Sequence, residues 1–62
     1  METSPKIVMV DDNTDYLFTM ETFLKRNGFE VETSEDGRKG LELIRKKTPD
    51  IILLDVMMET LF

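Results

Sequence analysis

The 62-residue chain contains no cysteine and no histidine. Without cysteine it can form neither a disulfide nor a thiolate metal site. Without histidine it lacks the commonest metal ligand and the usual proton shuttle. A metal site in this chain would therefore consist of oxygen ligands, and a catalytic constellation of serine, histidine and aspartate is excluded.

Basic residues and long apolar runs are also scarce. Eight Lys and Arg stand against 13 Asp and Glu, for a net charge of −5, whereas binding to a nucleic-acid backbone needs a basic patch. No apolar run approaches the roughly 20 residues of a membrane helix, and residues 1–6 lack the apolar region of a signal peptide. We expect one small cytoplasmic domain that binds neither nucleic acid nor a membrane.

Glycine is missing where a phosphate-binding loop would need it. The segment between the apolar run 7–10 and the helical pattern that begins near residue 14 has none, which excludes a Walker or dinucleotide-binding loop. The acids in this segment, Asp11 and Asp12, are adjacent, so the Asp-x-Asp pattern of phosphatases is absent as well.

Apolar periodicity predicts five elements. The continuous apolar runs before Asp11 and Asp55 are typical of strands buried on both faces, and the alternation in 29–33 is typical of an edge strand. Helix-length segments between strands indicate a parallel sheet with right-handed connections. The predicted elements of this α/β domain are strands 6–11, 29–33 and 51–55 and helices 14–26 and 37–47.

The first of these helices has one predicted core face. Tyr16, Met20, Phe23 and Leu24 recur at helical spacing, with Leu17 at the margin of this stripe. Phe18 points away from the stripe. We expect it to be a single exposed apolar side chain, with contact to a partner as the alternative.

Three aspartates are predicted to meet at one edge of the sheet if the first and third strands are neighbours. Asp11 and Asp12 end the first strand and Asp55 ends the third, and the ends of neighbouring parallel strands lie about 5 Å apart. Two unit charges at 4 Å repel by roughly 4 kcal/mol at an effective dielectric constant of about 20. A bound Mg²⁺ would offset this repulsion, since it prefers oxygen ligands. The alternative is that Asp11 and Asp12 only cap and begin the helix that follows.

Three segments carry a resemblance to a known family. Residues 7–12 (IVMVDD), residues 35–41 (EDGRKGL) and residues 49–58 (PDIILLDVMM) resemble the N-terminal half of a response-regulator receiver domain, the CheY-like family of two-component signalling. The resemblance implies a doubly wound, flavodoxin-like parallel sheet with the strand order 2-1-3 in this half.

The resemblance also implies the site. Asp55 would be the phosphoacceptor, phosphorylated by a histidine kinase or phosphotransfer protein. Mg²⁺ would be bound directly by Asp12, through water by Asp11, and by Asp55 and the backbone carbonyl of Met57. Such a module would not be an enzyme.

The chain departs from the family pattern after the two methionines. The family usually continues with Pro-Gly, whereas Glu59 and Thr60 stand here. We expect residues 1–62 to be a truncated receiver domain whose strand 51–55 forms an open edge. Two copies would pair there as a homodimer, with residues 56–62 packed across the interface. The alternatives are a module that docks a kinase or dimerises without phosphotransfer, and an inactive fragment.

Overall fold

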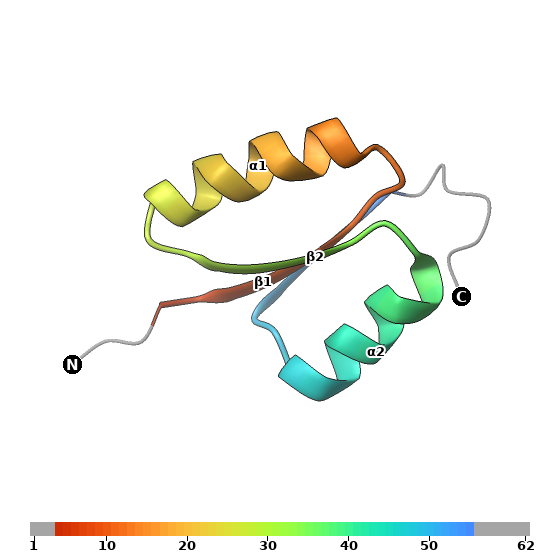
Figure 1. Ribbon diagram of the computed structural model, residues 1–62. Helices are drawn as coiled ribbons and strands as arrows, with labels where there is room; N and C mark the ends of the chain where they lie inside the picture. The colour runs from red at the N-terminus through yellow and green to blue at the C-terminus, as the bar shows by residue number, and fades with distance from the viewer. Residues whose placement is uncertain (1–3, 56–62) are drawn as a thin grey trace.

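The computed structural model describes residues 4–55, which form a three-stranded parallel sheet and two helices (Figure 1). The strand order β2-β1-β3 confirms the predicted order 2-1-3. Helix α1 lies over one face of the sheet and α2 over the other. The elements are β1 (Lys6–Val10), α1 (Thr14–Arg26), β2 (Glu30–Ser34), α2 (Gly37–Lys47) and β3 (Ile51–Leu54).

The central strand β1 provides most of the core. Its four apolar residues, 7–10, are each at most 3% exposed, because a central strand with a helix on either side is covered on both faces. On the α2 side, Val8 and Val10 pack against Leu43 and Ile44. The buried residues on the α1 side are Ile7, Met9, Leu17 and Val31.

Gly40 allows α2 to lie very close to the sheet. A Cβ atom placed on Gly40 would lie 3.0 Å from Cγ1 and 3.3 Å from Cβ of Val10, which is closer than packed carbon atoms normally approach. Val10 precedes Asp11, so this contact fixes the end of β1 from which the acidic segment starts.

The core face of α1 differs from the predicted stripe. Leu17 is buried, and Met20 and Leu24 pack beside it, but Tyr16 and Phe23 are 48% and 58% exposed. Helical spacing permits both choices, and the rotation of α1 about its own axis places Leu17 inward. Phe18 is exposed, as expected.

The limits of the three strands differ by one residue from the predicted ones. β2 begins at Glu30 rather than residue 29, since the Phe29 N–H donates to the Leu24 carbonyl at the end of α1. β1 and β3 end at Val10 and Leu54, which leaves Asp11 and Asp55 just beyond the ladder.

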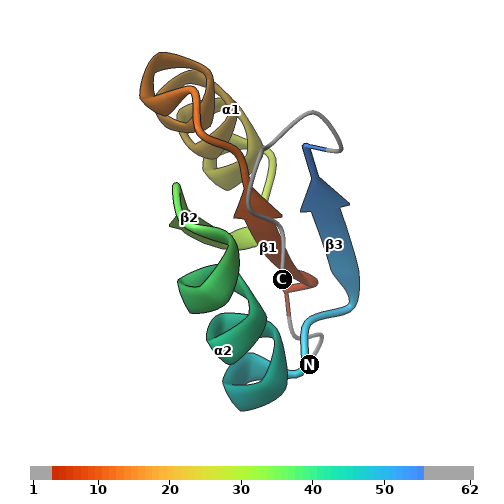
Figure 2. The ribbon, with the colours of Figure 1, turned by 90° about the vertical axis from the view of Figure 1, so that its right-hand side faces the viewer.

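Strand β3 is not buried on both faces, contrary to the sequence-based prediction. Its four aliphatic side chains are 38–43% exposed. Both helices lie over the β1 and β2 half of the sheet, as Figure 2 shows, and nothing else among residues 4–55 covers β3. An apolar run predicts that a strand can be buried, but burial also needs a covering element. Neither described helix is long and apolar enough to cross a membrane.

Candidate functional site

Backbone hydrogen bonds bring the predicted acidic residues to the same edge of the sheet. The Asp55 N–H donates to the Val10 carbonyl at 2.9 Å, and the Asp11 N–H donates to the Ser34 carbonyl at 3.1 Å. These bonds continue the parallel ladder one step past Val10, whose partner on β3 is Leu54. Asp55 and Asp11 are therefore held side by side at the carboxyl ends of neighbouring strands, where open α/β sheets bind ligands.

The three aspartates predicted from the sequence form one cluster. One carboxylate oxygen from each of Asp11, Asp12 and Asp55 lies within 4.8 Å of the others. Asp11 and Asp55 are half-buried, whereas Asp12 is exposed. The cluster borders an open hollow of about 530 Å³, which Asn13 and Tyr16 also line. Tyr16 had been assigned to the core stripe of α1, so its place beside the acids was missed.

The helix-cap alternative accounts for only part of this arrangement. The N-cap of α1 is Asn13, whose side-chain oxygen accepts the Tyr16 N–H at 3.0 Å. Asp11 supports the turn, because its Oδ1 accepts the Asn13 N–H at 2.9 Å. Neither bond involves Asp12, and capping gives no reason for Asp55 to lie beside the other two.

Comparison with known proteins identifies the family. The sequence model of the response regulator receiver domain matches residues 7–61.

The chain belongs to the response regulator receiver domain family.

Two relatives of the chain are named as transcriptional regulators. The chain is 42% identical over 59 residues to the transcriptional regulatory protein PrrA of Mycobacterium tuberculosis, a match that covers 95% of this chain and 25% of PrrA. It is 38% identical over 61 residues to the probable transcriptional regulator ycf27 of Guillardia theta, covering 98% and 24% of the two chains. The chain thus spans about a quarter of the length of these curated relatives.

A solved structure shows the same fold. The signal receiver domain of a putative Luxo repressor protein from Vibrio parahaemolyticus superposes with a TM-score of 0.80 at 24% identity. The match covers 89% of this chain and 42% of that one. The partial CheY-like sheet predicted from the sequence is therefore confirmed, and the family places the receiver in two-component signalling.

The expectation that the chain is simply not an enzyme needs correction. The matched family is that of receiver domains, which are phosphoacceptor modules as a class and take part in covalent group transfer although they are not classical enzymes. A bare contrast between enzyme and non-enzyme does not describe it.

The donor chemistry of the receiver's acidic cluster suits a hard divalent cation. Its three side chains supply only carboxylate oxygens, which Mg²⁺ and Ca²⁺ prefer, whereas zinc and copper sites generally use nitrogen or sulfur ligands. The half-buried Asp11 and Asp55 also point to a site at the edge of the fold, with solvent on the Asp12 side. The fourth predicted ligand, Met57, lies outside the described residues.

Asp36 lies outside the acidic cluster and has a different role. Asp36 is the N-cap of α2, and its Oδ1 accepts the backbone N–H of Arg38 at 2.7 Å and of Lys39 at 3.1 Å. The hydrogen bond from Lys39, followed by that from Arg38, lowers the pKa of the Asp36 carboxyl below its ordinary value. Asp36 does not belong to the cluster of Asp11, Asp12 and Asp55, so its ionised carboxyl stabilises the start of α2 instead.

Proposed function

We propose that the receiver accepts a phosphoryl group on Asp55 with the help of Mg²⁺. The observation that supports this proposal is the convergence of Asp11, Asp12 and Asp55 within 4.8 Å. The side chains of Asp12 and Asp55 would hold the cation directly and Asp11 would hold it through water. The backbone carbonyl of Met57 is the remaining proposed ligand and rests on the family resemblance alone. Bound Mg²⁺ would supply positive charge against the carboxylates and the transferring phosphoryl group.

In the proposed reaction, a carboxylate oxygen of Asp55 attacks the phosphorus of a phosphohistidine. A P–O bond forms, the P–N bond breaks, and its electron pair returns to the imidazole nitrogen of the donor. The hydrogen bond from the Asp55 N–H to the Val10 carbonyl holds the nucleophile in place, and the Asn13 N–H orients Asp11. The chain therefore contributes positioning and electrostatics, while the donor supplies the energy.

A histidine kinase or phosphotransfer protein is the proposed donor, since response regulators are the family shown. A small acyl phosphate offers a test that needs no partner. The receiver is incubated with acetyl phosphate and Mg²⁺, and its intact mass is measured. We expect the wild type to gain one phosphoryl group and Asp55→Asn to gain none.

Asp15→Asn is the matched control for this test. Asp15 is an exposed aspartate in the first turn of α1 and lies outside the three-carboxylate cluster, so the variant should be labelled like the wild type. An unlabelled wild type under conditions in which the protein is folded would contradict the proposal. Kinase capture by both wild type and Asp55→Asn, without labelling, would instead support a docking module.

The exposed edge of β3 favours a second proposal, that residues 1–62 pair as a homodimer. Four aliphatic side chains 38–43% exposed on an edge strand offer apolar area and backbone groups to another strand. Two copies of β3 would then pair antiparallel about a two-fold axis, and residues 56–62, outside the described part, were predicted to complete the contact. Sedimentation velocity should show a dimer at micromolar concentration. A folded monomer would exclude it.

A further inference from the structure

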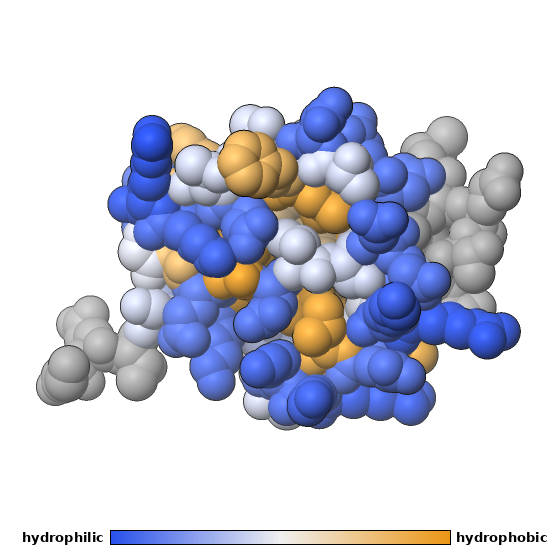
Figure 3. Space-filling model, in the orientation of Figure 1, coloured by the Kyte–Doolittle hydropathy of each residue, from blue (hydrophilic) through white to orange (hydrophobic). Residues whose placement is uncertain are grey.

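A groove runs along the outer edge of β2, on the side of the molecule away from β3. It has a volume of about 600 Å³ and lies between α1 and α2, with Phe18 and Glu21 on one wall and Lys39 and Leu43 on the other. Figure 3 looks onto this face, where hydrophobic side chains in the middle are surrounded by hydrophilic ones. The groove shares no lining residue with the hollow beside the three aspartates.

The backbone of β2 presents hydrogen-bonding groups to this groove. The Glu30 N–H donates to the Pro5 carbonyl, and the Ser34 carbonyl accepts the Asp11 N–H. The backbone N–H and C=O groups of the even-numbered residues of β2 therefore point toward β1. In a parallel ladder the intervening residues face the opposite edge, which places the N–H and C=O groups of Val31 and Thr33 there. Among residues 4–55, no strand pairs with that edge.

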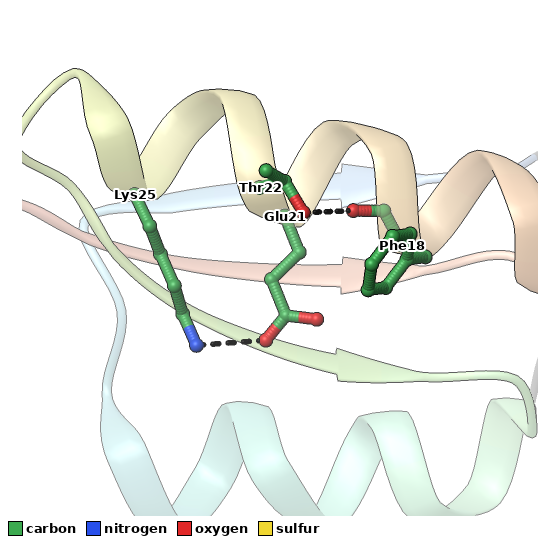
Figure 4. Close-up of polar contacts among 4 residues, drawn as sticks. All are labelled: Phe18, Glu21, Thr22 and Lys25. Carbon is green, nitrogen blue, oxygen red and sulfur yellow. Dashed lines mark hydrogen bonds and ion pairs between the residues drawn. The ribbon is translucent and has the colours of Figure 1, made fainter.

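The groove is acidic. Its lining contains Glu21, Glu35 and Asp36 but a single basic residue, Lys39. Part of this charge is already engaged, because Glu21 pairs with Lys25 at 2.8 Å (Figure 4) and Asp36 caps α2.

Two further carboxylates lie on β2 outside the groove. Glu30 and Glu32 are exposed on the strand itself, where Lys6 and Lys47 line the same hollow and balance their charge. Glu32 lies near enough to Lys25 to help raise the pKa of that ammonium, after the larger contribution of Glu21. The excess of negative charge therefore lies in the groove lining itself, with three carboxylates against one ammonium group, and it favours a cationic partner.

An apolar anchor lies beside these charges. Phe18 is 70% exposed, and Figure 4 shows its ring extending from α1 on the same side as Glu21 and Lys25. Its backbone carbonyl accepts the Thr22 hydroxyl at 2.9 Å. Phe18 thus projects from an intact helical turn with little of its surface buried. Aromatic side chains are common anchors at protein interfaces.

We propose that this groove binds an extended cationic segment of a partner protein, which adds to β2 as a further strand. Main-chain hydrogen bonds to Val31 and Thr33 would supply the pairing, as in other cases of strand addition. Lys or Arg side chains of the segment would lie near Glu21 and Glu35, and an alternating apolar side chain would cover Phe18. A helix cannot satisfy the row of backbone groups on the strand edge, so an extended segment fits the groove better.

A synthetic peptide of alternating lysine and valine is the probe, with an otherwise identical peptide of alternating glutamate and valine as the charge-reversed control. Each is titrated into the full chain labelled with ¹⁵N. We expect the lysine peptide to shift the amide resonances of residues 31–36 and of the facing turns of both helices. The glutamate peptide should bind at least tenfold more weakly. Added salt should lower the affinity of the lysine peptide for the chain.

Three variants separate the components of this site. Glu35→Lys and Phe18→Ala should each weaken binding several-fold. Thr33→Pro removes an N–H from the groove edge at a position where an edge strand tolerates proline, and it should abolish strand addition while the spectrum of the remaining fold is kept. Asp55→Asn should leave binding unchanged, so this proposal and the phosphoacceptor proposal fail independently. Shifts confined to β3 or to the three aspartates, equal binding of both peptides, or no shifts at millimolar lysine peptide would each overturn it.

Discussion

The N–H of Asp55 donates a hydrogen bond to the carbonyl of Val10, the residue immediately before Asp11. One main-chain contact therefore sets the distance between the proposed nucleophile on one strand and the proposed metal ligands on the next. Strand register thus brings the elements that carry the three carboxylates to one edge of the sheet. Changes that disturb the end of β1 should accordingly affect the acidic site and the stability of the fold together.

Substitution of Gly40 by alanine tests the packing that holds this end of β1. Alanine raises helix propensity by about 1 kcal/mol, but its Cβ would press on the side chain of Val10. Overpacking of this kind costs roughly 1–3 kcal/mol, so we expect a net loss in the free energy of unfolding, measured in urea. The exposed Arg45→Ala on the same helix is the control and should change stability by less than about 0.5 kcal/mol.

A double variant distinguishes this clash from a general loss of stability. Val10→Ala removes the methyl groups that the new Cβ would meet. Adding Gly40→Ala in that background should therefore cost less than it does in the wild type. Equal costs in the two backgrounds would show that contact with Val10 does not determine which side chain is tolerated at residue 40.

The cap of α1 gives a second prediction. Asn13→Ala removes the acceptor of the Tyr16 N–H and should lower the free energy of unfolding by about 1 kcal/mol. Asn13→Ser restores a capping oxygen and should recover most of that loss. Should Ala and Ser behave alike, the side chain of Asn13 would not be the functioning cap.

Asp36 makes stability depend on pH in a defined direction. The N–H groups of Lys39 and Arg38 lower the pKa of its carboxyl in the folded state below the ordinary 3.8. The cap therefore contributes fully above pH 3.8, and its contribution is lost as the pH falls through the lower folded-state value. Asp36→Asn keeps a capping oxygen that does not titrate.

The wild type and Asp36→Asn should accordingly be compared by thermal unfolding at several pH values. Their difference in stability should be constant from neutral pH to about pH 4. Below that pH the wild type should lose stability relative to Asp36→Asn. A difference that does not change between pH 4 and pH 2 would contradict the proposed role of the ionised cap.

Sequence patterns predicted the parts of this fold that depend on neighbouring residues. The apolar runs before Asp11 and Asp55 indicated two strands, and helix-length connections indicated that these strands are parallel. Together with the strand order 2-1-3 that the family resemblance implied, these two facts predicted that the three aspartates meet. The same patterns could not predict which face of α1 is buried, because Tyr16 and Leu17 both fit helical spacing and only the rotation of the helix on the sheet decides between them.

Features that depend on what covers an element were also missed. The run 51–54 has the composition of a buried strand, yet its side chains are more than a third exposed, because neither described helix lies over it. The groove along β2 has no sequence signature either. It combines Phe18 and Glu21 from α1 with Glu35 and Lys39 from beyond β2, and their proximity appears only once the helices are placed on the sheet.

The central claim is that Asp11, Asp12 and Asp55 together form one divalent cation site. The most direct measurement is a Mg²⁺ titration of the ¹⁵N-labelled chain, repeated for Asp12→Asn, Asp55→Asn and the control Asp15→Asn. We predict saturable shifts of residues 11–16 and 54–55 in the wild type and the control, with binding weakened at least tenfold in the first two variants. A wild-type spectrum that does not respond to millimolar Mg²⁺, or equal affinity in all four proteins, would contradict it.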